Sequence, residues 1–184
     1  MKIIRTRLPG CVVIEPAVHG DARGFFYESF NAQRYADAGL HLAFVQSNVS
    51  RSARGVLRGL HYQWPNPQGK LVSVLEGEVY DVAVDIRPGS PTCGQWAAAI
   101  LSADNKRHFW VPEGFAHGFA VLSEYATFTY QCTALYQREH DRAIRWNDAA
   151  LAIDWPIAEP SLSDKDMRAP FLADVPREAL PAYT

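Results

Sequence analysis

A strand-like segment near the middle of the chain carries an unusual density of polar and cationic side chains. Between Gln46 and Gln63, Arg58 and His61 stand among apolar neighbours. Buried cationic or polar side chains need partners that offset their loss of water. A lone histidine in such a place is more often a hydrogen-bonded core residue than a functional one. The residues that accompany His61 elsewhere in the sequence therefore decide its interpretation.

A second cluster is a P-x-G-x-x-H motif that ends at His117. It resembles the second motif of cupins, small β-barrels in which this histidine is often a metal ligand. Their first motif supplies H-x-H and a glutamate, but the matching place here reads H-Y-Q from His61, and Lys70 follows where a carboxylate is expected. A cation repels a divalent ion, and two histidines are too few ligands. The sequence therefore predicts a cupin-like pocket without a metal site.

Two further residues complete a possible proton-transfer site. In the strand-like segment 126–135, alternate residues share one face, so Phe128, Tyr130 and Cys132 would form an apolar wall with one hydroxyl. Taken alone, Tyr130 is more often a structural tyrosine, and Asp166 in the proline-rich tail is more often a solvated carboxylate. An Asp166 that folded back onto His61 would orient the ring and raise its basicity. The spacing leaves their proximity open.

The elements that must position these residues are predominantly β-strands. One short helix is predicted over Ala32–Ala38, with Asn31 as its N-cap and Gly39 as its C-terminal stop. Ten short β-rich runs lie between turn signals, at Ile3–Arg7, Val12–Glu15, Phe44–Val49, Val56–Tyr62, Leu71–Leu75, Val79–Ile86, Trp96–Leu101, His108–Val111, Phe115–Val121 and Ala126–Leu135. The fold class is therefore all-β.

The order of these runs suggests how the strands connect. The runs on either side of Glu76-Gly77-Glu78 predict a hairpin over Leu71–Ile86. Strand spacings of roughly 8–12 residues favour a sandwich or barrel closed around one interior. Five prolines mark the segment 146–184 as an irregular extension packed on the barrel. We expect residues 1–184 to form one domain.

Composition excludes several classes of protein. The chain has 184 residues, of which 48% are hydrophobic and 21% charged, which is typical of a globular protein with a packed core. A net charge of −2 without a basic run disfavours a nucleic-acid partner. No apolar run approaches the ~18 residues of a membrane span, and the start lacks a signal peptide, so we expect a cytoplasmic location and no membrane partner. Cys11, Cys93 and Cys132 have neither disulfide nor zinc-site spacing.

Eight motifs in order, between about Arg5 and about Pro170, resemble the dTDP-4-dehydrorhamnose 3,5-epimerase family. They are Gly20–Phe30, Gln46–Asn48, Gly55–Gln63, Lys70–Val72, Asp81–Arg87, Pro112–Phe119, Ile144–Asp148 and Leu162–Asp166. The resemblance implies a cupin-type jelly-roll β-barrel, a homodimer, no cofactor and a role in cell-surface carbohydrate biosynthesis. The implied reaction converts dTDP-4-dehydro-6-deoxy-D-glucose to dTDP-4-dehydro-L-rhamnose.

The resemblance also implies a role for individual residues. His61 is the expected proton acceptor, Tyr130 the proton donor and Asp166 the partner of His61. Expected substrate contacts are Arg23, Phe25, Glu28, Gln46, Ser47, Asn48, Arg58, Lys70, His117, Lys165 and Asp141, where the family usually has glutamate. The aromatic rings available for the thymine are Phe25, Phe26, Tyr27 and Tyr136.

This chemistry explains the residue types. The protons at C3 and C5 flank the C4 ketone, so removing either one places negative charge on the ketone oxygen, and a base and an oxygen stabiliser are the minimum requirement. Lys70 is suited to stabilise that oxygen. The phenol of Tyr130 keeps its proton at neutral pH and can donate it from the opposite face of the sugar.

One feature of the pattern conflicts with a regular strand. Arg58 and His61 are three residues apart and would face opposite sides. Either Gly59 introduces a bulge that resets the alternation, or one of the two side chains reaches a partner subunit's pocket.

Three other functions stay open at this level. A single-site 3- or 5-epimerase of a related dTDP-4-keto-deoxysugar pathway would share nearly all of these residues. A metal-dependent cupin oxygenase or isomerase would need bound metal. A non-catalytic sugar-nucleotide binding module would bind ligand without exchanging a proton.

Overall fold

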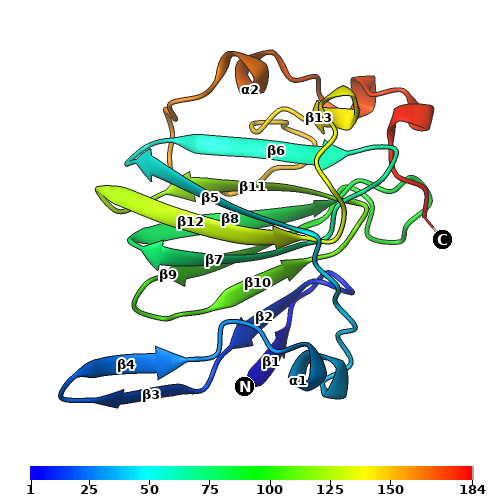
Figure 1. The fold of residues 1–184 in the computed structure, drawn as a ribbon. Coiled ribbons are helices and arrows are strands. Elements are labelled where there is room, and N and C mark those ends of the chain that lie inside the picture. The colour runs from blue at the N-terminus through cyan, green and yellow to red at the C-terminus, as the bar shows by residue number, and fades with distance from the viewer. Residues whose placement is uncertain (184) are drawn as a thin grey trace.

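The computed structural model describes residues 1–183 and consists mainly of two antiparallel sheets packed face to face (Figure 1). The first sheet has the order β1-β2-β10-β7-β12-β5 and the second the order β13-β6-β11-β8-β9. The strands of the first sheet are β1 (Lys2–Arg5), β2 (Val12–Glu15), β10 (His108–Val111), β7 (Lys70–Glu76), β12 (Tyr125–Cys132) and β5 (Gln46–Ala53). Those of the second are β13 (Asp141–Ala143), β6 (Leu57–Gln63), β11 (Phe115–Val121), β8 (Glu78–Asp85) and β9 (Trp96–Ser102). The predicted all-β jelly-roll class is confirmed.

The main hydrophobic core lies between the two sheets. Val72, Val74 and Phe128 of the first sheet pack in one cluster with Val79 and Phe119 of the second. Because successive side chains of a strand point to opposite faces, each strand gives every second residue to this core. At one end of the sandwich, polar side chains replace the apolar ones on the same inward face. That end holds the candidate site.

The predicted hairpin over Leu71–Ile86 is wrong in its pairing. Both strands form, but β7 pairs with β10 and β12, whereas β8 pairs with β11 and β9. The turn at Gly77 therefore carries the chain from one sheet to the other. A short glycine turn between two β-rich runs fits a hairpin and a sandwich corner equally well, and here each of the two strands has a different strand on either side.

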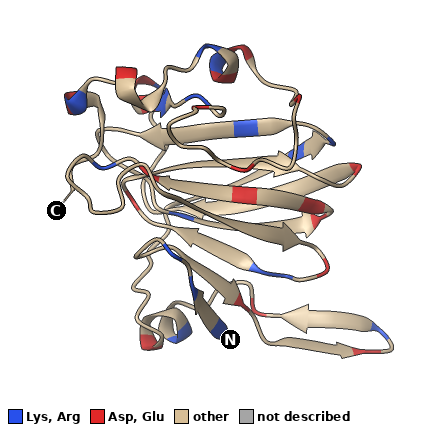
Figure 2. Ribbon diagram, turned by 180° about the vertical axis from the view of Figure 1, so that it is seen from behind, with Lys and Arg blue, Asp and Glu red and all other residues tan. Residues whose placement is uncertain are grey.

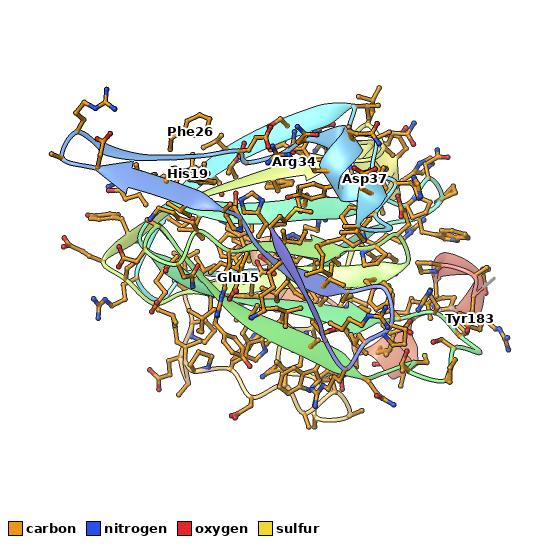
Figure 3. All side chains as sticks on the ribbon, turned by 90° about the horizontal axis from the view of Figure 1, so that it is seen from below. Glu15, His19, Phe26, Arg34, Asp37 and Tyr183 are labelled. Atoms are coloured by element: carbon orange, nitrogen blue, oxygen red, sulfur yellow. The ribbon has the colours of Figure 1, made fainter. Side chains whose placement is uncertain are left out.

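A hairpin that the sequence analysis did not predict projects from the body of the protein. Strands β3 (Val18–Asp21) and β4 (Gly24–Tyr27) form a two-stranded sheet of their own and extend away from the two larger sheets (Figure 1). Its tip residues are largely solvent-exposed. Figure 3 labels His19 and Phe26, which are cross-strand neighbours on this hairpin.

The helical elements agree in part with expectation. Helix α1 (Ala32–Asp37) begins as predicted, with the Asn31 side chain accepting a hydrogen bond from the Arg34 amide. Its buried Tyr35 packs against the outer face of the first sheet. The tail contains helix α2 (Asp164–Arg168), which the sequence analysis placed in irregular chain. Short 3-10 helices lie at η1 (Arg138–His140), η2 (Leu172–Asp174) and η3 (Arg177–Ala179).

The segment after residue 146 covers the outer face of the second sheet. Leu151 and Leu180 pack against Leu60, Val82 and Ala116 of that sheet in a second hydrophobic cluster. Figure 1 shows this part of the chain, in orange and red, above β6 and β11. The covering anchors the stretch that carries α2 beside β6, so residues far apart in sequence meet at one place.

Charged residues of both signs are scattered over the elements and the loops between them (Figure 2). Neither α-helix in the part of the chain described has the length and apolar composition needed to cross a membrane.

Candidate active site

One open end of the sandwich contains two adjoining cavities. The larger has a volume of ≈ 440 Å³ and is lined by Gln46, Asn48, His61, Tyr62, Gln63, Gln68, Lys70, Tyr130, Tyr136, Asp141 and Lys165. The smaller, of ≈ 150 Å³, is lined by Ser50, Arg58, His61, Lys70, His117, Phe119, Phe128 and Tyr130. His61, Lys70 and Tyr130 border both. Three residues that the sequence analysis placed at the centre of the chemistry are therefore brought together.

Asp166 is joined to His61, as expected. Its Oδ1 lies 2.5 Å from His61 Nε2, and the carboxylate is buried while the imidazole is 32% exposed. Local sequence explains the placement, because Ser163 is the N-cap of α2, accepts a hydrogen bond from the Asp166 amide and donates one to Asp166 Oδ2 at 2.8 Å. With Nε2 engaged, Nδ1 is the ring nitrogen left to take a proton.

The environment of Asp166 favours its ionised form. Burial alone would raise the pKa of this carboxyl, but hydrogen bonds from His61 and Ser163 and the charge of Lys165 together hold it below its usual range. Asp166 is therefore suited to stabilise a positive charge that develops on the imidazole.

The candidate acid and the candidate base come from opposite walls. His61 belongs to β6 in the second sheet, whereas Tyr130 belongs to β12 in the first. Phe128 and Tyr130 share the inward face as predicted, with their ring centroids 5.9 Å apart. Burial raises the pKa of Tyr130, so the phenol keeps its proton at neutral pH. A sugar ring between the walls would meet one group on each face.

Lys70 begins β7 and lies beside Cys132 of β12 in the ladder. Burial lowers the pKa of its ammonium group, although the charges of Cys132 and Asp141 work in the other direction. A desolvated ammonium interacts strongly with an arriving anionic oxygen. No three His, Cys, Asp or Glu side chains within residues 1–183 form a group that could hold a metal ion.

Arg58 reaches the same cavity as His61 because β6 is bulged. In the ladder with β11, Arg58 pairs with Phe119 and His61 with His117, so two residues of β6, Gly59 and Leu60, lie opposite the single Gly118. The bulge at Gly59 brings two glycines together, since a Cβ on Gly59 would lie 2.5 Å from Gly118 Cα. The expected bulge is confirmed. Arg58 Nε donates to Ser52 Oγ at 3.0 Å, which fixes the guanidinium.

His117 forms a second pair, with a carboxylate to which the sequence analysis gave no role. Its Nε2 lies 2.9 Å and 3.1 Å from the two oxygens of Asp81, which is fully buried. Burial raises the pKa of Asp81 above its usual range, while His117 and Lys70 only partly offset this. The signal was present in the sequence, because an aspartate inside the apolar run of β8 must find a partner.

The mouth of the larger cavity is formed by a connected set of polar side chains. Lys165 Nζ lies 2.5 Å from Asp141 Oδ2, and the Tyr136 hydroxyl donates to the same oxygen at 3.1 Å. Gln46 accepts a hydrogen bond from the Tyr136 amide and donates to Asn48. The shorter side chain of Asp141 therefore still reaches its neighbours here. The Tyr136 ring is half-exposed at this entrance.

Four expected substrate contacts line neither of the two cavities. Ser47 points to the outer face of β5, because it alternates with Gln46 and Asn48. Arg23 and Phe25 lie on the projecting hairpin, and Arg23 is 90% exposed and paired with Asp21. Glu28 follows the hairpin and binds Arg34 at 2.9 Å. These side chains lie outside both cavities of their own protomer, and the hairpin that carries Arg23 and Phe25 extends away from its own sheets.

Comparison with known proteins assigns the family. The profile of dTDP-4-dehydrorhamnose 3,5-epimerases matches residues 5–174. A dTDP-4-dehydrorhamnose 3,5-epimerase of Pseudomonas aeruginosa is 56% identical over 176 residues, which cover 95% of this chain and 97% of the relative.

Solved structures agree with this match. A dTDP-6-deoxy-D-glucose-3,5-epimerase of Legionella pneumophila, in complex with dTDP-4-keto-L-rhamnose, superimposes with a TM-score of 0.97 at 57% identity and covers 100% of this chain and 98% of its own. A 3'-monoepimerase of Streptomyces bikiniensis in complex with dTDP-quinovose gives 0.91 at 35% identity, with coverages of 98% and 93%. The chain belongs to the dTDP-4-dehydrorhamnose 3,5-epimerase family.

Proposed function

We propose that this protein epimerises C3 and C5 of dTDP-4-dehydro-6-deoxy-D-glucose to give dTDP-4-dehydro-L-rhamnose, a step of dTDP-L-rhamnose biosynthesis in the cytoplasm. The observation that carries the proposal is the convergence of His61, Lys70 and Tyr130 on one cavity, with His61 and Tyr130 on opposite walls. Inversion next to a ketone needs this arrangement, because the proton leaves one face of the sugar and returns to the other. In this proposal, residues 5–174, which the family profile matches, act as one catalytic domain.

In the first half-reaction, His61 Nδ1 takes the proton from C3 or C5. The C–H bond breaks, and its electron pair forms an enolate whose charge lies on the C4 oxygen. Asp166 stabilises the imidazolium that forms, as an orienting carboxylate does beside a catalytic histidine. The ammonium group of Lys70 stabilises the enolate oxygen.

In the second half-reaction, the Tyr130 hydroxyl gives its proton to the enolate carbon from the opposite face. The carbonyl re-forms, and the configuration at that carbon is inverted. The phenolate then takes a proton from water and His61 releases its proton to water, which restores both groups for the second carbon. Positioned acids and bases of this kind typically contribute about 10²–10⁴-fold each.

The nucleotide occupies the polar part of the site. Arg58 and Lys165 are suited to the diphosphate, because a guanidinium fork pairs with two oxygens and an ammonium group adds charge. Tyr136 offers a half-exposed ring for the thymine at the cavity mouth. His117, Gln46 and Asn48 supply further polar contacts.

We propose that the protein is a homodimer in which the β3–β4 hairpin serves the partner's site. The hairpin projects from its own protomer and presents Arg23, with Phe25 62% exposed (Figure 1). Mixing Arg23→Ala and His61→Ala subunits tests this arrangement. With shared sites, half of the random dimers hold one intact site, and roughly a quarter of wild-type activity returns. With self-contained sites, no activity returns.

Deuterium incorporation tests the reaction itself. Incubation with the 4-keto sugar nucleotide in deuterated water should place deuterium at both C3 and C5, observed by NMR. Exchange at neither carbon would refute the proposal. Parallel samples treated with chelator should exchange at the same rate, and loss of exchange there would point to a metal-dependent reaction instead.

The alternative is a single-site 3- or 5-epimerase, supported by the similarity to the Streptomyces bikiniensis 3'-monoepimerase. It predicts deuterium at one carbon only. The same NMR spectrum therefore separates the two functions.

A further inference from the structure

Gln63 is a buried side chain beside the candidate site that neither proton transfer nor charge recognition uses. It follows His61 by two residues on β6, lines the larger cavity and is 4% exposed. A buried primary amide must satisfy its donors and its acceptor. The partners of Gln63 are therefore informative.

All three polar contacts of this amide go to backbone groups. Gln63 Nε2 donates to the carbonyl oxygens of Asn66, at 2.6 Å, and Leu135, at 3.1 Å. Gln63 Oε1 accepts a hydrogen bond from the Gln137 amide at 2.8 Å. Two carbonyls and one N–H fix the orientation of the side-chain amide. In the reverse orientation its oxygen would face the two carbonyl oxygens, and its NH2 group would face the Gln137 N–H.

Two of these contacts lie on either side of one residue. Leu135 and Gln137 flank Tyr136, so a single side chain holds the backbone before and after the aromatic ring. The Gln63 backbone also pairs with Asp141 in the β6–β13 ladder, and Asp141 accepts the Tyr136 hydroxyl hydrogen bond. Gln63 thus fixes the loop that carries Tyr136 and lies beside the residue that binds the end of its ring.

We propose that Gln63 is a positioning residue that sets the distance between the proton-transfer site and the nucleobase subsite. His61 and Gln63 share one face of one strand, about 6.5 Å apart. Strand β6 therefore carries both His61, the base that acts on the sugar, and Gln63, which holds the loop of Tyr136, the ring that receives the thymine. The inference rests on the proposed function in one respect, the stacking of the thymine on Tyr136.

The role predicts a particular kinetic signature. Gln63→Met keeps the length of the side chain but leaves two carbonyls and one N–H without their partner. A loosened Tyr136 ring must then be ordered by the ligand, which costs affinity. We expect dTDP, measured by calorimetry, to bind about three- to tenfold more weakly. KM should rise by a similar factor, and kcat should stay within about twofold because His61 is untouched.

A double-mutant cycle with Tyr136→Ala separates positioning from general loosening. If Gln63 acts through the ring, Gln63→Met should cost no further dTDP affinity in the Tyr136→Ala background. Additive losses would overturn the proposal, as would a fall in kcat at unchanged KM. Gln33→Met is the control, because Gln33 is an exposed residue of α1 whose side chain donates a hydrogen bond to Asp37. Full dTDP affinity in Tyr136→Ala would instead refute the stacking step of the proposed function.

A second variant keeps the test decisive if Gln63→Met does not fold. The carboxylate introduced by Gln63→Glu can accept from the Gln137 amide, but its other oxygen faces two carbonyls unless it is protonated. The dTDP affinity of this variant, relative to wild type at the same pH, should therefore recover as the pH falls from about 8 to about 6, because burial among carbonyls raises the pKa of a carboxyl. An unchanged ratio over this range would contradict the role assigned to Gln63.

Discussion

The site contains two histidine–carboxylate pairs with the same chemical groups and different surroundings. His61–Asp166 lies beside both cavities, where the imidazole is 32% exposed and the carboxylate accepts a hydrogen bond from Ser163, the N-cap of a helix that packs beside β6. His117–Asp81 lies deeper, between neighbouring strands, where the imidazole is only 8% exposed. The pKa of Asp166 is lowered, whereas that of Asp81 is raised.

The difference shows that the supply of hydrogen bonds, and not burial alone, decides what such a pair does. Both carboxylates are nearly inaccessible to solvent. Asp166 has Ser163 and His61 as donors and Lys165 as a nearby charge, and these outweigh burial. Asp81 is held chiefly by His117, and burial prevails. The first pair is suited to accept a proton, and the second to hold a ring in place.

The largest expected effect on turnover is that of removing His61. His61→Ala should lower kcat by at least about a hundredfold, because it removes the general base. The dissociation constant for dTDP should stay within about twofold, measured by calorimetry. Replacement of His117 by Asn should lower turnover less. Equal losses in the two variants would remove the distinction between the pairs.

The next effect concerns the carboxylate of the same pair. Asp166→Asn keeps the size of the side chain but removes the charge that stabilises the imidazolium, and we expect kcat to fall by roughly 10- to 100-fold. Asp81→Asn should have a smaller effect on kcat. Steady-state kinetics at one pH, with thermal unfolding as the folding control, would check both. A greater loss in Asp81→Asn would reverse the assignment of roles.

The pH dependence of stability should differ in sign between the two carboxylates. Asp166 has a folded-state pKa below its ordinary value of 3.8, so its contribution to stability is present above that value and is lost as the pH falls through the folded-state pKa. Asp81 has a folded-state pKa above 3.8, so the native protein binds more protons, and stability is lost as the pH rises through the window above 3.8.

Urea unfolding between about pH 3 and 7 measures both effects. On acidification from about pH 7, wild type should gain stability relative to Asp81→Asn. Its advantage over Asp166→Asn should shrink only below about pH 3.8. Parallel curves for the two variants would show that the surroundings of the two carboxylates do not differ in the way described.

The smallest expected effect tests how helix α2 supports the His61–Asp166 pair. Ser163→Ala removes the N-cap of α2 and one hydrogen bond to Asp166, which should cost about 1 kcal/mol of stability. Because Asp166 keeps its contact with His61, kcat should fall only about two- to threefold. Chemical denaturation and steady-state rates would measure both quantities. Unchanged values of both would mean that α2 is fixed without this cap.

Much of the site could be predicted because its chemistry requires particular residue types. His61, Lys70, Tyr130 and Asp166 belong to motifs that resemble the family, and the structure places them together. The bulge at Gly59 could also be anticipated, because Arg58 and His61 could not otherwise share a pocket. The strands around the core followed from their alternation, with ends shifted by a few residues.

The rest depends on contacts that a linear pattern does not encode. The turn at Gly77 suits a hairpin or a corner, and only the competition among strands for partners decides that β7 and β8 enter different sheets. The projecting hairpin around Arg23 has little core of its own, so its hydrophobic pattern is weak. Asp81 and Gln63 were missed because their roles depend on groups many residues away.

The contact between Gly59 and Gly118 has a consequence for how this scaffold could be redesigned. A Cβ on Gly118 would lie 2.7 Å from the Arg58 carbonyl oxygen, and Gly59 holds a backbone conformation that other L-residues rarely adopt. Neither position therefore tolerates a larger residue without moving the backbone that carries Arg58. Mutant libraries that aim to change which sugar nucleotide is accepted should therefore keep Gly59 and Gly118. They should instead vary the residues around Tyr136 and Asp141 at the mouth of the larger cavity.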